Sequence, residues 1–116
     1  MNDAITRDEL KNKMDRGAEF TLVETLPASE FERQHLPGAI NVPAAKTKDL
    51  GHELPNKEAE IVVYCANATC PSSDDAAAEL RRRGYINVRR YVGGKQDWAD
   101  AGLPLEGKQR PPGPQW

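Results

Sequence analysis

The run Ile61-Val62-Val63-Tyr64 limits what this chain can fold into more than any other part of its sequence. Its apolar side chains follow one another without a polar residue between them, whereas a strand with one face in water alternates the two kinds. An unbroken apolar run is typical of a central strand in a parallel sheet, because helices cover both faces of such a sheet. The run therefore predicts an α/β domain, and it places Cys65 at the carboxyl end of a buried strand.

Capping and turn residues divide the rest of the chain into alternating helices and strands. Thr6 followed by Glu9 has the pattern of a capping box at the start of an N-terminal helix, and Gly17 suits a left-handed end of that helix. Pro71 suits the first position of a later helix, which ends before Gly84. Strands are expected at residues 20–23, 40–42, 61–64 and 86–92, and further helices at residues 29–34, 46–54, 71–83 and 95–101.

The length and charge of the chain exclude several classes of protein. Its 116 residues suffice for one compact domain, expected over residues 1–107, and the Pro- and Gly-rich tail at residues 108–116 is expected to be disordered. A formal net charge of -2 supplies no basic surface for nucleic acid or acidic lipid, so we expect neither as a partner. No apolar run is long enough to span a bilayer, and the N-terminus lacks the apolar stretch of a secretory signal. A cytoplasmic location is expected.

The chain contains two cysteines, Cys65 and Cys70. In a reducing compartment such a pair is more often reactive or metal-binding than structural. The two histidines, His35 and His52, lie far apart in unrelated segments, so the four side chains match no compact structural zinc site. We therefore expect no metal and no other cofactor, and interpret the cysteines as reactive.

Several features favour a reactive thiolate at Cys65. It follows the strand directly and is expected outside the core, and the helix that begins at Pro71 directs its positive end toward it. Backbone N–H groups of the short loop after it would stabilise a thiolate or the terminal sulfur of a persulfide. A buried structural cysteine is the other interpretation, since cysteine is among the most buried residue types. The residues expected to form the sulfur-binding loop are Ala66, Asn67, Ala68, Thr69 and Cys70.

Taken together, several segments of the chain resemble the rhodanese homology domain in their order and spacing. These segments are Leu22-Val23-Glu24, Glu30-Phe31, His35-Leu36-Pro37-Gly38-Ala39-Ile40-Asn41-Val42-Pro43, Ile61-Val62-Val63-Tyr64-Cys65, Gly84-Tyr85 with Val88, Gly93-Gly94, and Trp98. The resemblance extends over residues 5–106. It implies a five-stranded parallel sheet flanked by helices, and a cycle in which Cys65 takes up a sulfane sulfur and passes it to a thiophilic acceptor.

The length of the active loop also resembles that of the sulfurtransferases. The related phosphatases and arsenate reductases of this fold have a longer loop that ends in arginine, and Pro71 stands where that arginine would fall. Phosphoryl chemistry would therefore lack its charge clamp. A departure from the family is Glu24, which stands where the family usually has aspartate.

The nature of the sulfur donor depends on charge. The loop contains no Lys or Arg, whereas many family members that use thiosulfate carry at least one there. Lys95, just after the glycine pair, is a candidate substrate-binding cation, and the alternative is a solvated surface lysine. The expected donor is thiosulfate or a low-charge persulfide. The expected acceptor is a small thiol or cyanide-like molecule, or a protein that accepts sulfur.

Cys70 has three interpretations. Its thiol could attack the Cys65 persulfide as a resolving thiol and release sulfide, it could relay the sulfur to a partner, or it could simply pack under the loop. His35 and Trp98 are expected to be structural, the first in a turn and the second in the core. Two alternatives to the sulfurtransferase remain. One is a non-catalytic protein-binding module, and the other is a dithiol redox switch of Cys65 and Cys70.

Overall fold

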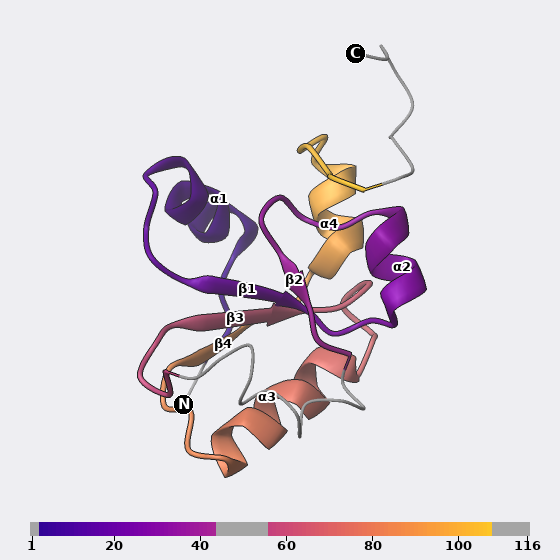
Figure 1. The fold of residues 1–116 in the computed structure, drawn as a ribbon. Coiled ribbons are helices and arrows are strands. Elements are labelled where there is room, and N and C mark those ends of the chain that lie inside the picture. Colours follow the sequence, from indigo (N-terminus) through magenta and orange to yellow (C-terminus); the bar gives the residue numbers. More distant parts are fainter. Residues whose placement is uncertain (1–2, 44–55, 108–116) are drawn as a thin grey trace.

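The structure is a computed structural model that describes residues 3–43 and 56–107. The helix predicted at residues 46–54 and the tail at residues 108–116 lie outside the described residues. In chain order the elements are α1 (Arg7–Asp15), β1 (Thr21–Glu24), α2 (Ala28–Arg33), β2 (Ile40–Asn41), β3 (Ile61–Tyr64), α3 (Ser72–Arg82), β4 (Val88–Tyr91) and α4 (Gly94–Asp100). Figure 1 shows their arrangement.

The four strands form one parallel sheet in the order β2-β1-β3-β4. All four residues of β3 are buried, which confirms the central strand predicted from its apolar run. The family resemblance implies five strands, and the described residues form four. At the free edge of β4, Ala4 makes a single parallel bridge to Arg90, where a fifth strand would lie. The predicted parallel α/β architecture is confirmed.

Helices cover both faces of the sheet, and β3 contributes alternate side chains to the two layers. Ile61 and Val63 pack with Ala77 and Leu80 of α3 on one face. Val62 and Tyr64 point to the other face, which α1, α2 and α4 cover. On that face the core consists of Ile5, Leu10, Leu22, Leu36, Ala39, Val62, Tyr64, Tyr91 and Trp98. Figure 1 shows α3 on one side of the sheet and α1 and α4 on the other.

Local capping explains where α1 begins and ends. The Thr6 hydroxyl accepts a hydrogen bond of 3.1 Å from the Glu9 N–H, as predicted for the capping box. Gly17 follows the helix with a φ of 68°, the left-handed conformation that favours glycine. Among the described helices none is long and apolar enough to cross a membrane.

The predicted element bounds are shifted by one or two residues. The strand predicted at residues 20–23 is β1, Thr21–Glu24, and that predicted at residues 86–92 is the shorter β4.

Trp98 is fully buried, and its indole N–H donates to the Pro104 carbonyl at 2.8 Å. Its predicted role as a core anchor is confirmed.

Candidate functional site

The loop from Cys65 to Cys70 leaves the carboxyl end of β3 and leads to α3. The two cysteines are joined by a disulfide, with their Cα atoms 6.2 Å apart. Ligands of parallel α/β sheets bind at this end of the strands, because the loops that follow the strands meet there. The structure thus brings both predicted thiols together at the expected edge of the sheet.

Cys65 is far more buried than the sequence suggested. Only 1% of its surface is exposed, so the expectation that it lies outside the core is wrong. The burial of β3 continues one residue beyond the strand, because the start of α4 and the returning loop cover that residue. Cys70, by contrast, is only partly buried.

The start of α4 holds the first half of the loop. The Lys95 N–H donates to the Cys65 carbonyl at 2.9 Å, and the Gln96 N–H donates to the Ala66 carbonyl at 2.8 Å. Gly94 lies against the same backbone with a φ of 68°, and a Cβ atom on it would lie 2.6 Å from the Cys65 carbonyl oxygen. Only glycine fits there, so the backbone at Cys65 has a fixed position relative to the sheet.

Asn67 organises the second half of the loop. Its side-chain oxygen accepts hydrogen bonds from the Thr69 N–H at 3.1 Å and from the Thr69 hydroxyl at 2.9 Å. Its carbonyl accepts from the Cys70 N–H at 3.2 Å. Two of the five amides predicted to bind sulfur are therefore engaged within the loop, and these bonds turn Cys70 back toward Cys65. The binding role of the remaining amides stays a prediction.

A buried polar network lies at the same end of the sheet. The Glu24 carboxylate is fully buried and accepts hydrogen bonds from the Tyr64 hydroxyl at 2.7 Å and from the Lys95 ammonium at 3.1 Å. The Tyr64 hydroxyl in turn accepts from the Leu36 N–H at 3.0 Å. Burial raises the pKa of Glu24 above its ordinary value, although Tyr64 and Lys95 oppose that shift. Burial and the neighbouring carboxylate raise the pKa of Tyr64.

Lys95 belongs to this network through both its backbone and its side chain. Its ammonium group also contacts the Glu30 carbonyl at 3.3 Å, and 12% of the side chain is exposed. The alternative of a solvated surface lysine is therefore wrong, because the charge is paired inside the protein. Its role as a substrate-binding cation stays a prediction. Glu24 departs from the family pattern, but nothing in the sequence indicates that it meets a lysine 71 residues away.

His35 has the structural role expected of it. Its ring stacks on Phe31 with centroids 3.9 Å apart, and its Nδ1 lies 2.7 Å from the Phe31 carbonyl oxygen. Its Nε2 lies 3.6 Å from the Glu106 carboxylate, and the two residues also form a backbone bridge. His35 thus joins the end of α2 to the C-terminal part of the described chain.

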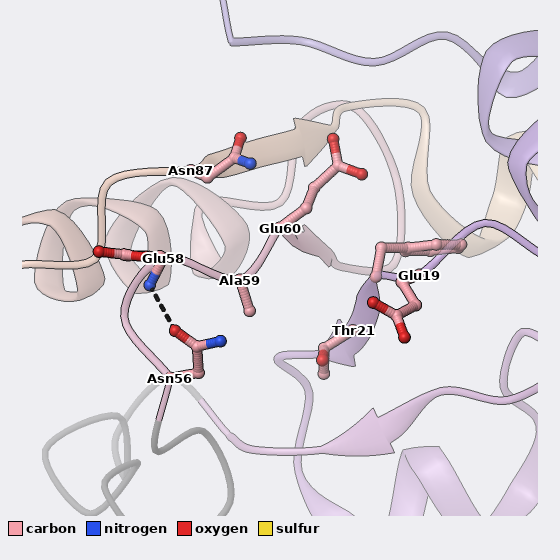
Figure 2. Close-up of a pocket in the computed structure, with 8 residues that line it drawn as sticks. Glu19, Thr21, Asn56, Glu58, Ala59, Glu60 and Asn87 are labelled. Carbon is pink, nitrogen blue, oxygen red and sulfur yellow. Dashed lines mark hydrogen bonds between the residues drawn. The ribbon is translucent and has the colours of Figure 1, made fainter.

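A pocket lies at the opposite end of the sheet, where the strands begin (Figure 2). Its lining residues are Glu19, Phe20, Thr21, Asn56, Glu58, Ala59, Glu60 and Asn87. The pocket is acidic, and Glu60 is paired with Lys13 at 2.6 Å. No three His, Cys, Asp or Glu residues within residues 3–43 and 56–107 form a metal-binding group, at this end or elsewhere. The thiols make the carboxyl end the candidate site.

Comparison with known proteins identifies relatives over most of the chain. The family model described as the Rhodanese-like domain matches residues 6–101. The rhodanese-like domain of the Alr3790 protein from Anabaena, solved by NMR, has a TM-score of 0.83 and 26% sequence identity, with 99% of this chain and 89% of that chain covered.

Two curated relatives carry the same kind of domain within longer proteins. The HTH-type transcriptional regulator Rv0324 of Mycobacterium tuberculosis is 41% identical over 104 residues, which are 90% of this chain and 45% of that protein. The adenylyltransferase and sulfurtransferase UBA4 of Candida albicans is 37% identical over 86 residues, which are 68% of this chain and 19% of that protein. The chain thus spans less than half the length of either relative.

Proposed function

This chain belongs to the rhodanese-like domain family, and we propose that it is a sulfurtransferase that carries sulfane sulfur as a persulfide on Cys65. The observation that supports the proposal most is the position of Cys65. It directly follows the central strand β3 and is the first residue of the short loop that leads to α3. A relative named as a sulfurtransferase supports the same chemistry.

The proposed cycle starts from the dithiol form, which a dithiol reductant generates from the Cys65–Cys70 disulfide. The Cys65 thiolate attacks the sulfane sulfur of the donor, and the electron pair of the broken bond leaves with the donor. A thiolate or cyanide acceptor then attacks the outer sulfur and releases the Cys65 thiolate. Loop amides and the positive end of α3 would stabilise the anionic sulfur at each stage.

We propose that the donor is a low-charge persulfide in preference to thiosulfate. The loop carries no cation, and the ammonium group of Lys95 is occupied by Glu24 and the Glu30 carbonyl. Within the described loop and its network, a dianion would therefore lack an ion-pair partner. We expect kcat/KM for glutathione persulfide to exceed that for thiosulfate by about tenfold, the ratio that corresponds to about 1.4 kcal/mol of lost interaction. Equal values, or a preference for thiosulfate, would contradict this choice of donor.

The nucleophile is tested with Cys65→Ser. Reduced wild-type protein treated with a persulfide donor is expected to gain, before it releases sulfide, the mass of one sulfur atom on the peptide that contains Cys65, and to form thiocyanate when cyanide is added. The Cys65→Ser variant is expected to lose both, down to the uncatalysed background. Thiocyanate formation by a correctly folded Cys65→Ser variant would overturn the proposal. Absence of thiocyanate in the wild type with either donor would favour a binding module.

A further inference from the structure

Cys70 reaches the sulfur of Cys65 within the loop as the structure describes it. The Cα separation of 6.2 Å lies in the ordinary range for a disulfide, and the hydrogen bonds of Asn67 within the loop and of α4 to the loop are present together with the bond. Direct contact between the two Sγ atoms therefore does not require these contacts to break.

The two sulfur atoms of a persulfide on Cys65 are accessible to different nucleophiles. In the disulfide form Cys65 is 1% exposed, and its Sγ atom, which would be the inner sulfur of a persulfide, is bonded to Cys70. The outer sulfur extends one bond further and is the atom available to an external acceptor. Cys70 is partly exposed, and it is the residue whose thiol meets the inner sulfur.

We infer that Cys70 is a resolving thiol that attacks the inner sulfur and releases sulfide, an inference that rests on the proposed persulfide at Cys65. The Cys70 thiolate forms a bond to the Cys65 Sγ atom, the bond from Sγ to the outer sulfur breaks, and the outer sulfur leaves as hydrosulfide. The two cysteines are oxidised to a disulfide and the sulfane sulfur is reduced to sulfide, so no external oxidant takes part. A dithiol reductant then restores both thiols by disulfide exchange.

The surroundings of Cys70 favour its thiolate form. It lies just before Pro71 and the positive end of α3, an eleven-residue helix. Asp74 and Asp75 in the first turn would oppose a thiolate, and of these the Asp74 carboxylate is paired with Arg90. Relay of the sulfane sulfur to Cys70 would require attack on the outer sulfur, whereas the observed contact is with Sγ. The chain therefore has two outlets for sulfur, namely transfer to an acceptor and release as sulfide at the expense of a dithiol.

The test is a single turnover without oxygen, which removes air as a source of disulfide. Reduced protein freed of reductant is mixed with glutathione persulfide, and released sulfide and the Cys65–Cys70 disulfide are followed over time. The wild type is expected to form one disulfide for each sulfide that it releases. Cys70→Ser is expected to keep the persulfide and to release sulfide at least about tenfold more slowly, because an intramolecular thiol has a high effective concentration. Cys70→Ala should behave in the same way.

The matched control restores the number of thiols at another place. Ile86 is strongly exposed and precedes β4, at the opposite end of the sheet from Cys65. Ile86→Cys in the Cys70→Ser background is expected to leave sulfide release slow. Rapid release from this double variant would mean that thiols attack between molecules, and the inference would be wrong.

The remaining outcomes separate the inference from the proposed function. If Cys70→Ser holds a persulfide on Cys65 but releases sulfide as fast as the wild type, the inference fails and the sulfurtransferase stands. A persulfide found on Cys70 in the wild type would show relay, and it too would overturn the inference. If neither protein gains sulfur at Cys65, the proposed function fails and the inference fails with it.

Discussion

The two ends of the parallel sheet each carry a lysine–glutamate pair, and the pairs differ in what surrounds them. Lys95 and Glu24 are 3.1 Å apart at the carboxyl end, and Lys13 and Glu60 are 2.6 Å apart at the amino end. Both lysine side chains are little exposed, at 12% and 11%. Glu24 is fully buried, however, whereas Glu60 is 17% exposed and lines the open pocket of Figure 2.

The difference lies in what each pair is connected to. Glu24 also accepts from Tyr64, and the backbone N–H of Lys95 holds the Cys65 carbonyl. The Lys13 ammonium lies 5.8 Å from the centre of the Phe20 ring, so that pair joins α1 to the entry of the sheet. The same two residue types thus support the reactive loop at one end and anchor a helix at the other.

The largest expected effect comes from removing each lysine in turn. Lys95→Met leaves the Glu24 carboxylate buried without its cation, and the expected loss of unfolding free energy is about 3–5 kcal/mol near neutral pH. Lys13→Met is expected to cost about 1 kcal/mol or less, because Glu60 retains contact with water. Urea unfolding of the two variants and the wild type measures both values. Equal losses of unfolding free energy would show that the two ion pairs do not differ in burial as proposed.

The loss of unfolding free energy in Lys95→Met is expected to depend on pH. Because the pKa of Glu24 is raised in the folded protein, the folded state binds this proton more tightly than the unfolded state does. The contribution of Glu24 to stability therefore falls as the pH rises from its ordinary pKa through the raised one. Removing the cation raises that pKa further, so the loss should be smaller at about pH 5 than at about pH 8. A loss that grows toward low pH would contradict this sign.

A smaller effect is expected from two glycines with the same backbone conformation. Gly17, at the amino end of the sheet, and Gly94 both have a φ of 68°, but a Cβ on Gly17 meets nothing within 4 Å, whereas one on Gly94 meets the Cys65 carbonyl. Gly17→Ala should cost about 1–2 kcal/mol, from backbone strain alone. Gly94→Ala adds a steric clash, and we expect about 2–4 kcal/mol. Gly94→Ala should also speed the alkylation of reduced Cys65 by iodoacetamide. An unchanged alkylation rate would show that Gly94 does not control access to Cys65.

The smallest losses of unfolding free energy are expected from two tyrosine substitutions, which test how far the buried network extends across the carboxyl end of the sheet. Tyr64 and Tyr91 are register partners on β3 and β4. Tyr64→Phe leaves the Leu36 N–H and a Glu24 oxygen without a partner, at a cost of about 1–3 kcal/mol. Tyr91→Phe removes a bond to Asp97, which is partly exposed and keeps Arg7, so about 0.5–1 kcal/mol is expected. If the second loss is the larger in urea unfolding, the network is not centred on Glu24.

Much of the fold was predictable because its signals are local. The apolar run of β3, the capping box at Thr6 and the left-handed Gly17 each depend on residues that are close in sequence, and all three predictions are confirmed. The position of Cys65 after β3 follows from the same run. Element bounds moved by a residue or two where backbone pairing with a neighbouring strand continues, as at Glu24, which extends β1 by pairing with Asn41 and Tyr64.

The candidate site was predictable only in part. The sequence placed both cysteines on one short loop, but it put Cys65 outside the core, whereas α4 and the returning loop cover it. It treated Lys95 as facing either a substrate or solvent, and the structure pairs it with Glu24. Nothing in the spacing of these residues indicates which of them meet.

The parallel α/β architecture and the strand-to-loop position of Cys65 can be predicted from the chain's residue pattern, because periodicity and capping act between neighbours along the chain. The burial of Cys65, its bond to Cys70 and the ion pair of Glu24 with Lys95 arise only in the folded chain. Contacts of that kind depend on the order of the strands and on the packing of α4 against the loop. Those are properties of the folded chain as a whole, and no short segment of the sequence carries them.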